Sequence, residues 1–251
     1  MFVPVTFFVL MKNSILRMSA IKKIRNELFR LTHLGSKYYC VYCGKSYRRF
    51  MHEGVKAEVF KKHRVSGGGY KKNVKCPNCL SVDRSRLLYL FFQLRTKVFH
   101  EKTKILHISP NYEIAQFLCQ HKTIEHITGA LEPERFTQFD AIKIDVQKID
   151  FSDNTFDVVI CCHVIEHVDD DKAAMREIFR VLKPKGFAVL QVPLAIDMQT
   201  TIEDKSATTN KLRKIAHGQN DHVRIYGLDY LDKLRSVGFR VVRDNPFNDH
   251  W

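Results

Sequence analysis

Two pairs of cysteines have a spacing that is typical of a metal site. Cys40 and Cys43 form one Cys-x-x-Cys pair, and Cys76 and Cys79 form the other. Each such turn directs two sulfurs at one ion, so the two pairs together can supply a tetrahedral thiolate cage. A closed four-cysteine site leaves no open coordination position, and we therefore expect a structural zinc ion in a reducing compartment. A redox role for one pair is the less favoured interpretation.

The stretch DVVICCHVIEHVDDD, residues 157–171, combines two more cysteines with two histidines. It is open to three interpretations: a metal site, a thiol nucleophile with its base, or a ligand-binding loop. Cys161 and Cys162 are adjacent at the end of an apolar run, and neighbouring side chains of a strand point to opposite faces. They cannot bind one metal together without distortion. We therefore expect a buried strand followed by a pocket loop, with His163 and His167 in the loop.

Strands and helices that must position these residues alternate from residue 104 onwards. The apolar patterns predict strands at 104–109, 125–130, 140–145, 155–162 and 187–194. Helices are expected up to about Gln120, at 84–95, at 170–182 and at 226–238, with a further strand at 239–244. This alternation predicts an α/β fold with a Rossmann-like, doubly wound, mostly parallel sheet. The polar stretch 195–222 is expected to form a lid or an inserted loop.

The N-terminal part of the chain differs from the rest in charge. Residues 1–100 hold 21 Lys and Arg against 4 Asp and Glu, whereas the remaining residues hold 20 against 23. One interpretation is an anionic partner, such as nucleic acid, a phosphorylated substrate or a membrane surface, and the other is a solvated basic face. We expect three domains: an N-terminal extension with a basic helix over 18–33 (1–37), a zinc-ribbon-like module (38–82) and the sheet domain (83–251).

The apolar start of the chain, MFVPVTFFVLMK, is too short to span a membrane, which takes roughly 20 apolar residues. It also lacks the positive start and the cleavage site of a secretory signal. We expect no transmembrane segment and a cytoplasmic protein, with peripheral attachment at a membrane surface as the alternative. Residues 1–17 are interpreted as a start-site extension, since the sequence from Met18 reads better as a beginning, or as a weak surface anchor.

Open parallel sheets bind ligands at the carboxyl ends of their strands. In this chain those ends are Ser109–Asn111, Leu131–Glu132, Asp145–Val146 and Cys162–His163. A dinucleotide fold needs GxGxxG after the first strand, whereas the turn here is HISPNYE, so a pyrophosphate has poor access to the backbone. S-adenosylmethionine carries no phosphate and tolerates such a turn better.

The chain from residue 104 to 243 resembles class I S-adenosylmethionine-dependent methyltransferases of the type-11 group. The residues that carry this resemblance are Asp145, FDVV at 156–159, IEHV at 165–168 and RVLKPKG at 180–186. The cysteine module, the LHISPN turn and GQNDHVRIYG at 218–227 further resemble a bacterial subgroup with an N-terminal zinc-ribbon-like segment.

The resemblance implies methyl transfer to an oxygen or nitrogen of a small-molecule or saccharide-type acceptor, which includes glycan-linked acceptors. It assigns the cofactor to the turns after the strands, and it places candidate bases at the acceptor side. The implied cofactor-binding residues are His107, Ser109, Asn111, Glu132, Asp145, Val146, Cys162 and His163. The implied catalytic residues are His167 and His222, for which packing in the loop is the alternative role.

Three features depart from the family pattern. The first turn is SPN where the family has glycines, and Leu131 ends strand two where an acid should hold the ribose hydroxyls. Glu132, one position later, is the expected substitute. After the strand at 239–244 only NPFNDHW remains, so we expect the last strand of the fold to be missing. Either the strand at 239–244 then pairs directly with the strand at 187–194, or the chain is a fragment with a weakened sheet edge.

Two other functions compete with the small-molecule methyltransferase. An RNA methyltransferase would use the basic N-terminal region for binding, since phosphate contacts dominate RNA affinity. The aromatic candidates for base stacking are Tyr38, Tyr39, Tyr42 and Tyr47, which can equally pack around the metal site. A non-catalytic zinc-ribbon scaffold is the third interpretation. Nothing in the sequence indicates an oligomeric state.

Overall fold

The computed structural model describes residues 32–242, which divide into two units. One unit contains residues 32–53 and Lys72–Arg86, and the other contains Gly54–Lys71 and residues 87–242. The predicted extension over 1–17 lies outside the described residues, as does the predicted basic helix except for its last two residues.

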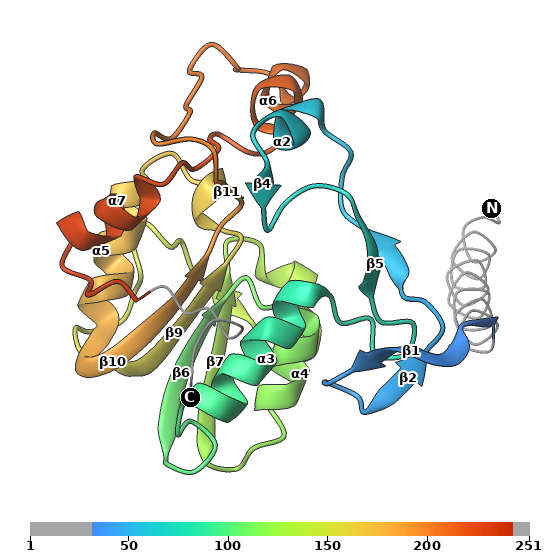
Figure 1. The fold of residues 1–251 in the computed structure, drawn as a ribbon. Coiled ribbons are helices and arrows are strands. Elements are labelled where there is room, and N and C mark those ends of the chain that lie inside the picture. Colours follow the sequence, from blue (N-terminus) through green and yellow to red (C-terminus); the bar gives the residue numbers. More distant parts are fainter. Residues whose placement is uncertain (1–31, 243–251) are drawn as a thin grey trace, which may run out of the picture. The chain divides into compact units, whose positions relative to one another are not determined.

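The larger unit is built on a parallel sheet of five strands. In sheet order these are β10 (Leu182–Gln191), β9 (Phe156–Cys162), β6 (Thr103–Ile108), β7 (Ile124–Ala130) and β8 (Ile142–Lys143). Every neighbouring pair in this order is parallel (Figure 1). The predicted Rossmann-like α/β sheet is therefore confirmed. The third predicted strand is much shorter than expected, because only two residues pair with β7.

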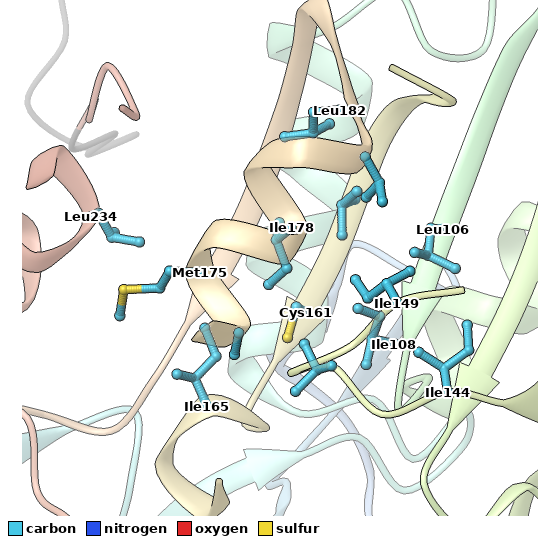
Figure 2. Packing of buried hydrophobic residues seen from close by; sticks show 14 of the residues in the cluster. Leu106, Ile108, Ile144, Ile149, Cys161, Ile165, Met175, Ile178, Leu182 and Leu234 are labelled. Carbon is cyan, nitrogen blue, oxygen red and sulfur yellow. The ribbon is translucent and has the colours of Figure 1, made fainter. Parts of the chain in front are cut away.

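Helices cover both faces of this sheet because its central strands are apolar on both sides. α3 (Asp83–Arg95) and α4 (Tyr112–Leu118) supply Leu88, Phe92 and Ile114 to one hydrophobic cluster. α5 (Asp171–Val181) and α7 (Tyr230–Ser236) supply side chains to the other, which Figure 2 shows around Cys161. Cys161 and Cys162 belong to different clusters, which confirms that their side chains point to opposite faces.

The chain after α7 does not form the further strand that was predicted over 239–244. Residues 239–242 lie in no strand, and 243–244 lie outside the described residues. The ring of Phe239 instead stacks edge-on against that of Phe179 in α5, with ring centroids 5.1 Å apart. Phe239 and Val241 both pack on the hydrophobic cluster around Cys161. The alternating apolar pattern is thus explained by packing against α5, and β10 remains an edge of the described sheet.

The segment between the two cysteine pairs folds with the sheet unit. β4 (Val65–Ser66) pairs antiparallel with β11 (Leu194–Ala195), and α2 (Glu58–Lys62) lies beside α6 (Asn210–His217) (Figure 1). The predicted lid region 195–222 therefore contains a helix and is covered by this segment. The boundaries of the zinc-ribbon-like module at 38 and 82 stay a prediction, but residues 54–71 group with the sheet.

The smaller unit consists of short strands around the cysteines. β1 (Leu34–Cys40) pairs antiparallel with β2 (Lys45–Tyr47), and β3 (Met51–Glu53) pairs with β5 (Lys71–Lys75). Tyr47 and Phe50 are buried beside Cys40 and Cys76, with Tyr38 and Tyr42 packed against them. Most of the apolar surface of this unit thus surrounds the cysteine sulfurs. Among the helices of residues 32–242, none has the length and apolar character that a membrane crossing requires.

Candidate functional site

The sulfurs of Cys40, Cys43, Cys76 and Cys79 gather in one place, as the sequence predicts. Their Sγ atoms all lie within 4.8 Å of one another, with Cys40 and Cys79 at 3.6 Å and Cys43 and Cys76 at 3.8 Å. Four thiolates at about 2.3 Å from a tetrahedral ion are about 3.8 Å apart, so these two distances are close to those of a zinc site.

The backbone after each cysteine pair adopts the same turn. Gly44 and Leu80 follow the pairs directly, and both have left-handed φ angles, of 66° and 62°. The N–H of Gly44 donates to the carbonyl of Cys40 at 2.9 Å, and the N–H of Leu80 donates to that of Cys76 at 3.0 Å. Two equivalent turns thus present two sulfurs each. Arg86 braces the second of these turns by donating to the carbonyls of Ser81 and Val74.

In the sheet unit, the strand order reverses between β6 and β9, and this point is where open parallel sheets bind ligands. Ile108 of β6 is paired with Cys161 of β9, so the residues that follow the two strands emerge side by side. Ser109 and His163 both have left-handed φ angles, of 50° and 59°. Such strained non-glycine residues cluster at ligand sites, which makes this edge the candidate site of the unit.

The predicted first cofactor turn lies at this edge. His107 is fully buried, and burial lowers the pKa of its imidazole to about 3, so the ring is neutral. The backbone N–H of Asn111 donates to Nε2 of His107 at 3.2 Å, which leaves the proton on Nδ1. This Nδ1 is buried and has no hydrogen-bond partner in the part of the chain that the structure describes. The N–H of Ser109 donates to the carbonyl of Gly129 at 2.7 Å.

The predicted residues after β7 and β8 are less clearly arranged for a ligand. Glu132 is exposed, and its carboxylate pairs with Arg135 at 3.1 Å. The side chain of Asp145 accepts from the backbone N–H of Gln147 at 2.9 Å and stabilises the turn. Val146 is buried in the hydrophobic cluster beneath the sheet edge, so its side chain does not face a pocket. Glu132 must leave Arg135 if it is to hold ribose hydroxyls.

The structure brings His167 and His222 together, although 55 positions separate them in the sequence. Their rings are perpendicular, with centroids 4.6 Å apart. His167 follows β9 in the short helix η2 (Ile165–His167), and Nδ1 of its ring lies 3.2 Å from the carbonyl oxygen of Asp221. His222 is buried, and this burial lowers the pKa of its imidazole to about 4, so the ring is neutral.

Glu166 lies beside these histidines and was not predicted from the sequence as a site residue. Its side chain is only 1% exposed, and Oε1 accepts from Nδ1 of His163 at 3.2 Å. Nε2 of His167 lies 4.0 Å from the same oxygen. The signal for Glu166 was an acidic residue inside the apolar run VIEHV, since a buried carboxylate requires partners. We call Glu166, His167 and His222 the histidine–glutamate cluster.

Arg224 fixes the loop that carries this cluster. Its guanidinium is 2% exposed and donates to the carbonyls of Ile165, Val168 and Asp169, and to Oε1 of Glu203 at 2.6 Å. A single side chain thereby connects the GQNDHVRIYG segment to the loop after β9. Cys162, by contrast, is 4% exposed and packs among the side chains of α3 and α4, so only its backbone is close to the site edge.

Part of the sheet unit is similar to a known protein family. Residues 110–190 match the family model of a methyltransferase domain. The match runs from α4 to β10 and confirms the predicted resemblance at the level of the methyltransferase domain; the four-cysteine subgroup stays a prediction. The matched residues contain the turns after β7, β8 and β9, together with Glu166 and His167.

Two curated relatives that match part of this chain are named as sterol methyltransferases. Sterol 24-C-methyltransferase of Schizosaccharomyces pombe is 30% identical over 114 residues, which are 43% of this chain and 28% of the relative. The corresponding enzyme of Kluyveromyces lactis is 33% identical over 115 residues, 43% of this chain and 29% of the relative. The chain therefore matches less than a third of the length of these relatives.

A solved structure of similar fold is a putative methyltransferase from Bacillus halodurans. It has a TM-score of 0.44 and 17% identity, and the similarity covers 62% of this chain and 67% of that chain. The [4+2]-cyclase SpnF has a TM-score of 0.46 and 18% identity, covering 63% and 58% of the two chains.

Proposed function

We propose that this protein is an S-adenosylmethionine-dependent methyltransferase acting on a small-molecule acceptor. The match of residues 110–190 to a methyltransferase domain carries the proposal, because it spans the strand ends at which a parallel sheet binds its ligand. S-adenosylmethionine supplies an activated methyl group, so the protein has mainly to align the acceptor with it. The four cysteines are proposed to hold a structural zinc ion.

We assign the cofactor to the edge of the sheet between β6 and β9. His107, Ser109 and Asn111 form its first turn, and the backbone at Cys162 and His163 forms the opposite wall. Asp145 and Val146 are proposed to approach the adenine through the backbone of the turn that the Asp145 side chain stabilises, with Glu132 as the ribose-binding acid. The buried Nδ1–H of His107, which has no partner among the described residues, supports this assignment as a polar group that awaits a ligand.

The acceptor is assigned to the side of the histidine–glutamate cluster. His167 and His222 are proposed as the groups that take a proton from an oxygen or nitrogen acceptor. The saccharide-type acceptor suggested by the sequence resemblance remains part of this proposal. The names of the curated relatives describe transfer to carbon, so identification of the methylated atom is part of the test.

A small acceptor is proposed in preference to RNA because of the tyrosines near the cysteines. Tyr47 is buried beside the cysteine cluster, and Tyr38 and Tyr42 are half-buried against it, so their rings are largely occupied by packing. Tyr39 alone of these four is strongly exposed. If RNA is methylated and binds with a steep dependence on salt, this preference is wrong.

Calorimetry with S-adenosylhomocysteine tests the cofactor site, with two variants of one position as a matched pair. Ser109→Gly is expected to bind as the wild type does, because glycine adopts the left-handed φ of this turn without strain. Ser109→Val is expected to bind about tenfold or more weakly, since a left-handed conformation costs about 1–2 kcal/mol for a side chain with Cβ and more when it is branched.

Circular dichroism must show that both variants fold. If the wild-type protein binds no cofactor at millimolar concentration, the methyltransferase proposal is wrong for this chain, and a non-catalytic scaffold becomes the better interpretation. If both variants bind equally well, the cofactor lies elsewhere than the turn after β6.

A further inference from the structure

The histidine–glutamate cluster contains buried polar atoms that have no partner. Oε2 of Glu166 and Nδ1 of His222 are both buried, and neither forms a hydrogen bond with any residue between 32 and 242. Each of these two side chains is 1% exposed. A buried polar atom left without a partner destabilises the fold, so two of them at one place indicate a group that is bound there.

The ligand atoms of the cluster converge on one point. Glu166, His167 and His222 each offer one nitrogen or carboxylate oxygen, and these atoms all lie within 4.8 Å of one another. Ligand atoms bound at about 2.1 Å to a common ion are at most about 4.2 Å apart. In a tetrahedral site such atoms are about 3.4 Å apart, so binding an ion would draw the most widely separated of these atoms together by up to roughly 1.4 Å, which side-chain rotation can supply.

Neighbouring groups hold these side chains in the orientation that a metal requires. Nδ1 of His167 lies 3.2 Å from the carbonyl oxygen of Asp221 and donates its proton there, which leaves the lone pair of Nε2 free. His163 donates to Oε1 of Glu166 and fixes the carboxylate. Metal-binding histidines almost always donate their second N–H to a carbonyl or carboxylate in this way.

We propose that Glu166, His167 and His222 form a second metal site, separate from the four cysteines. Two imidazoles and one carboxylate favour a transition-metal cation such as Mn²⁺, Fe²⁺, Co²⁺ or Zn²⁺ over Mg²⁺ or Ca²⁺. Three protein ligands leave coordination positions open, and the side chain of His167 is 31% exposed, which gives a ligand access.

The open positions suggest a role in the transfer reaction, and this role rests on the proposed function. A hydroxyl or carboxylate of the acceptor bound to the ion would be held at the carboxyl edge of β9. The ion would lower the pKa of a bound hydroxyl, whose proton would leave to solvent, and the resulting oxygen would attack the methyl group with S-adenosylhomocysteine as the leaving group. His167 and His222 would then act as ligands of the ion, in place of the proton acceptors proposed above. The acceptor class is then one that carries an oxygen able to bind a metal.

Titration of the metal-free protein with Co²⁺ tests the site, because the two kinds of ligand give different spectra. The cysteines should give an intense thiolate-to-cobalt absorption, and the histidine–glutamate cluster only weak visible bands. We expect two equivalents in the wild type. We expect one in Glu166→Gln and in His222→Gln, each with the thiolate absorption intact, and one in Cys40→Ser with only the weak bands. Glu134→Gln, at an exposed carboxylate, should still bind two.

A wild-type protein that binds a single equivalent through thiolates overturns the inference, and so do Glu166 and His222 variants that bind as the wild type does. The intact thiolate absorption and circular dichroism show whether each variant is folded. If a variant fails to fold, the wild-type stoichiometry and its cobalt spectrum decide. Cofactor binding is measured separately. A protein that binds the second metal ion but no S-adenosylhomocysteine would contradict the proposed function and leave the metal site supported.

Discussion

Substitution of Phe60 by alanine tests whether residues 54–71 fold cooperatively with the sheet unit. Phe60 lies in α2 and is 4% exposed, packed with Ala195 and Ile225. Its ring centroid is 6.1 Å from that of His222. Replacing a buried phenylalanine by alanine usually costs 3–5 kcal/mol, and we expect about 3 kcal/mol because this cluster is small.

Urea unfolding followed by far-ultraviolet circular dichroism measures this loss, which corresponds to a melting temperature lower by about 6–12 °C. Phe60→Leu keeps most of the buried surface and should lose about 1 kcal/mol. Lys61→Ala changes an exposed neighbour on the same helix and should stay within about 0.5 kcal/mol of the wild type. If Phe60→Ala unfolds at the wild-type urea concentration and only becomes sensitive to protease within 54–71, the segment does not fold cooperatively with the sheet and the reasoning is wrong.

Two further predictions concern the cysteines and an ion pair. Cys40→Ser should lower the zinc content measured by mass spectrometry by one ion per chain, and an unchanged zinc content would contradict the four-cysteine site. Removal of zinc from the wild type with a chelator should expose Cys43 and Cys79 to alkylation, while buried Cys161 stays protected. Glu177→Gln should cost about 1.5–3 kcal/mol at pH 7, because Arg180 donates to Glu177 and lowers the pKa of its carboxyl. The ion pair therefore stabilises the fold above the unfolded pKa of about 4.3, and this stability is lost as the pH falls through the lowered pKa of the folded protein. The difference in urea unfolding between the two proteins should shrink as the pH is lowered, and a difference that stays the same in acid would contradict this.

The sheet could be predicted because its signals are local and periodic. The apolar runs around Ile105, Ile127 and Val159 are long enough to identify strands, and the two-residue period assigned Cys161 and Cys162 to opposite faces. The prediction of a strand over 239–244 was wrong because it rested on the alternating apolar pattern alone. An alternating apolar pattern fits a strand and equally fits an extended segment packed on a helix, and only the tertiary contacts of Phe239 distinguish the two.

The candidate site was predicted only in part, because its geometry depends on non-local contacts. His167 and His222 were both predicted as site residues, but their proximity could not be predicted. It depends on Arg224, which binds Glu203 and the carbonyls of the loop after β9, and nothing in the sequence indicates these contacts. Glu132 was expected to face a ribose, whereas the nearest cation, Arg135, lies three positions away and takes its carboxylate. Spacing along the chain identifies which residues reach the sheet edge, and competing partners decide where each side chain points.

Residues 54–71 lie between the two cysteine pairs in the sequence, so the chain itself connects the cysteine cluster to the site. The segment has Phe60 near His222, and a Cβ placed on Gly67 would lie 3.8 Å from Cε1 of His163. An ion held by both cysteine pairs closes the loop of 32 residues from Cys43 to Cys76. Closing such a loop in the unfolded chain removes about 3.7 kcal/mol of conformational freedom. The segment then loses less entropy when it packs on the sheet, so filling of the cysteine site should favour the arrangement in which His163 and His222 are covered.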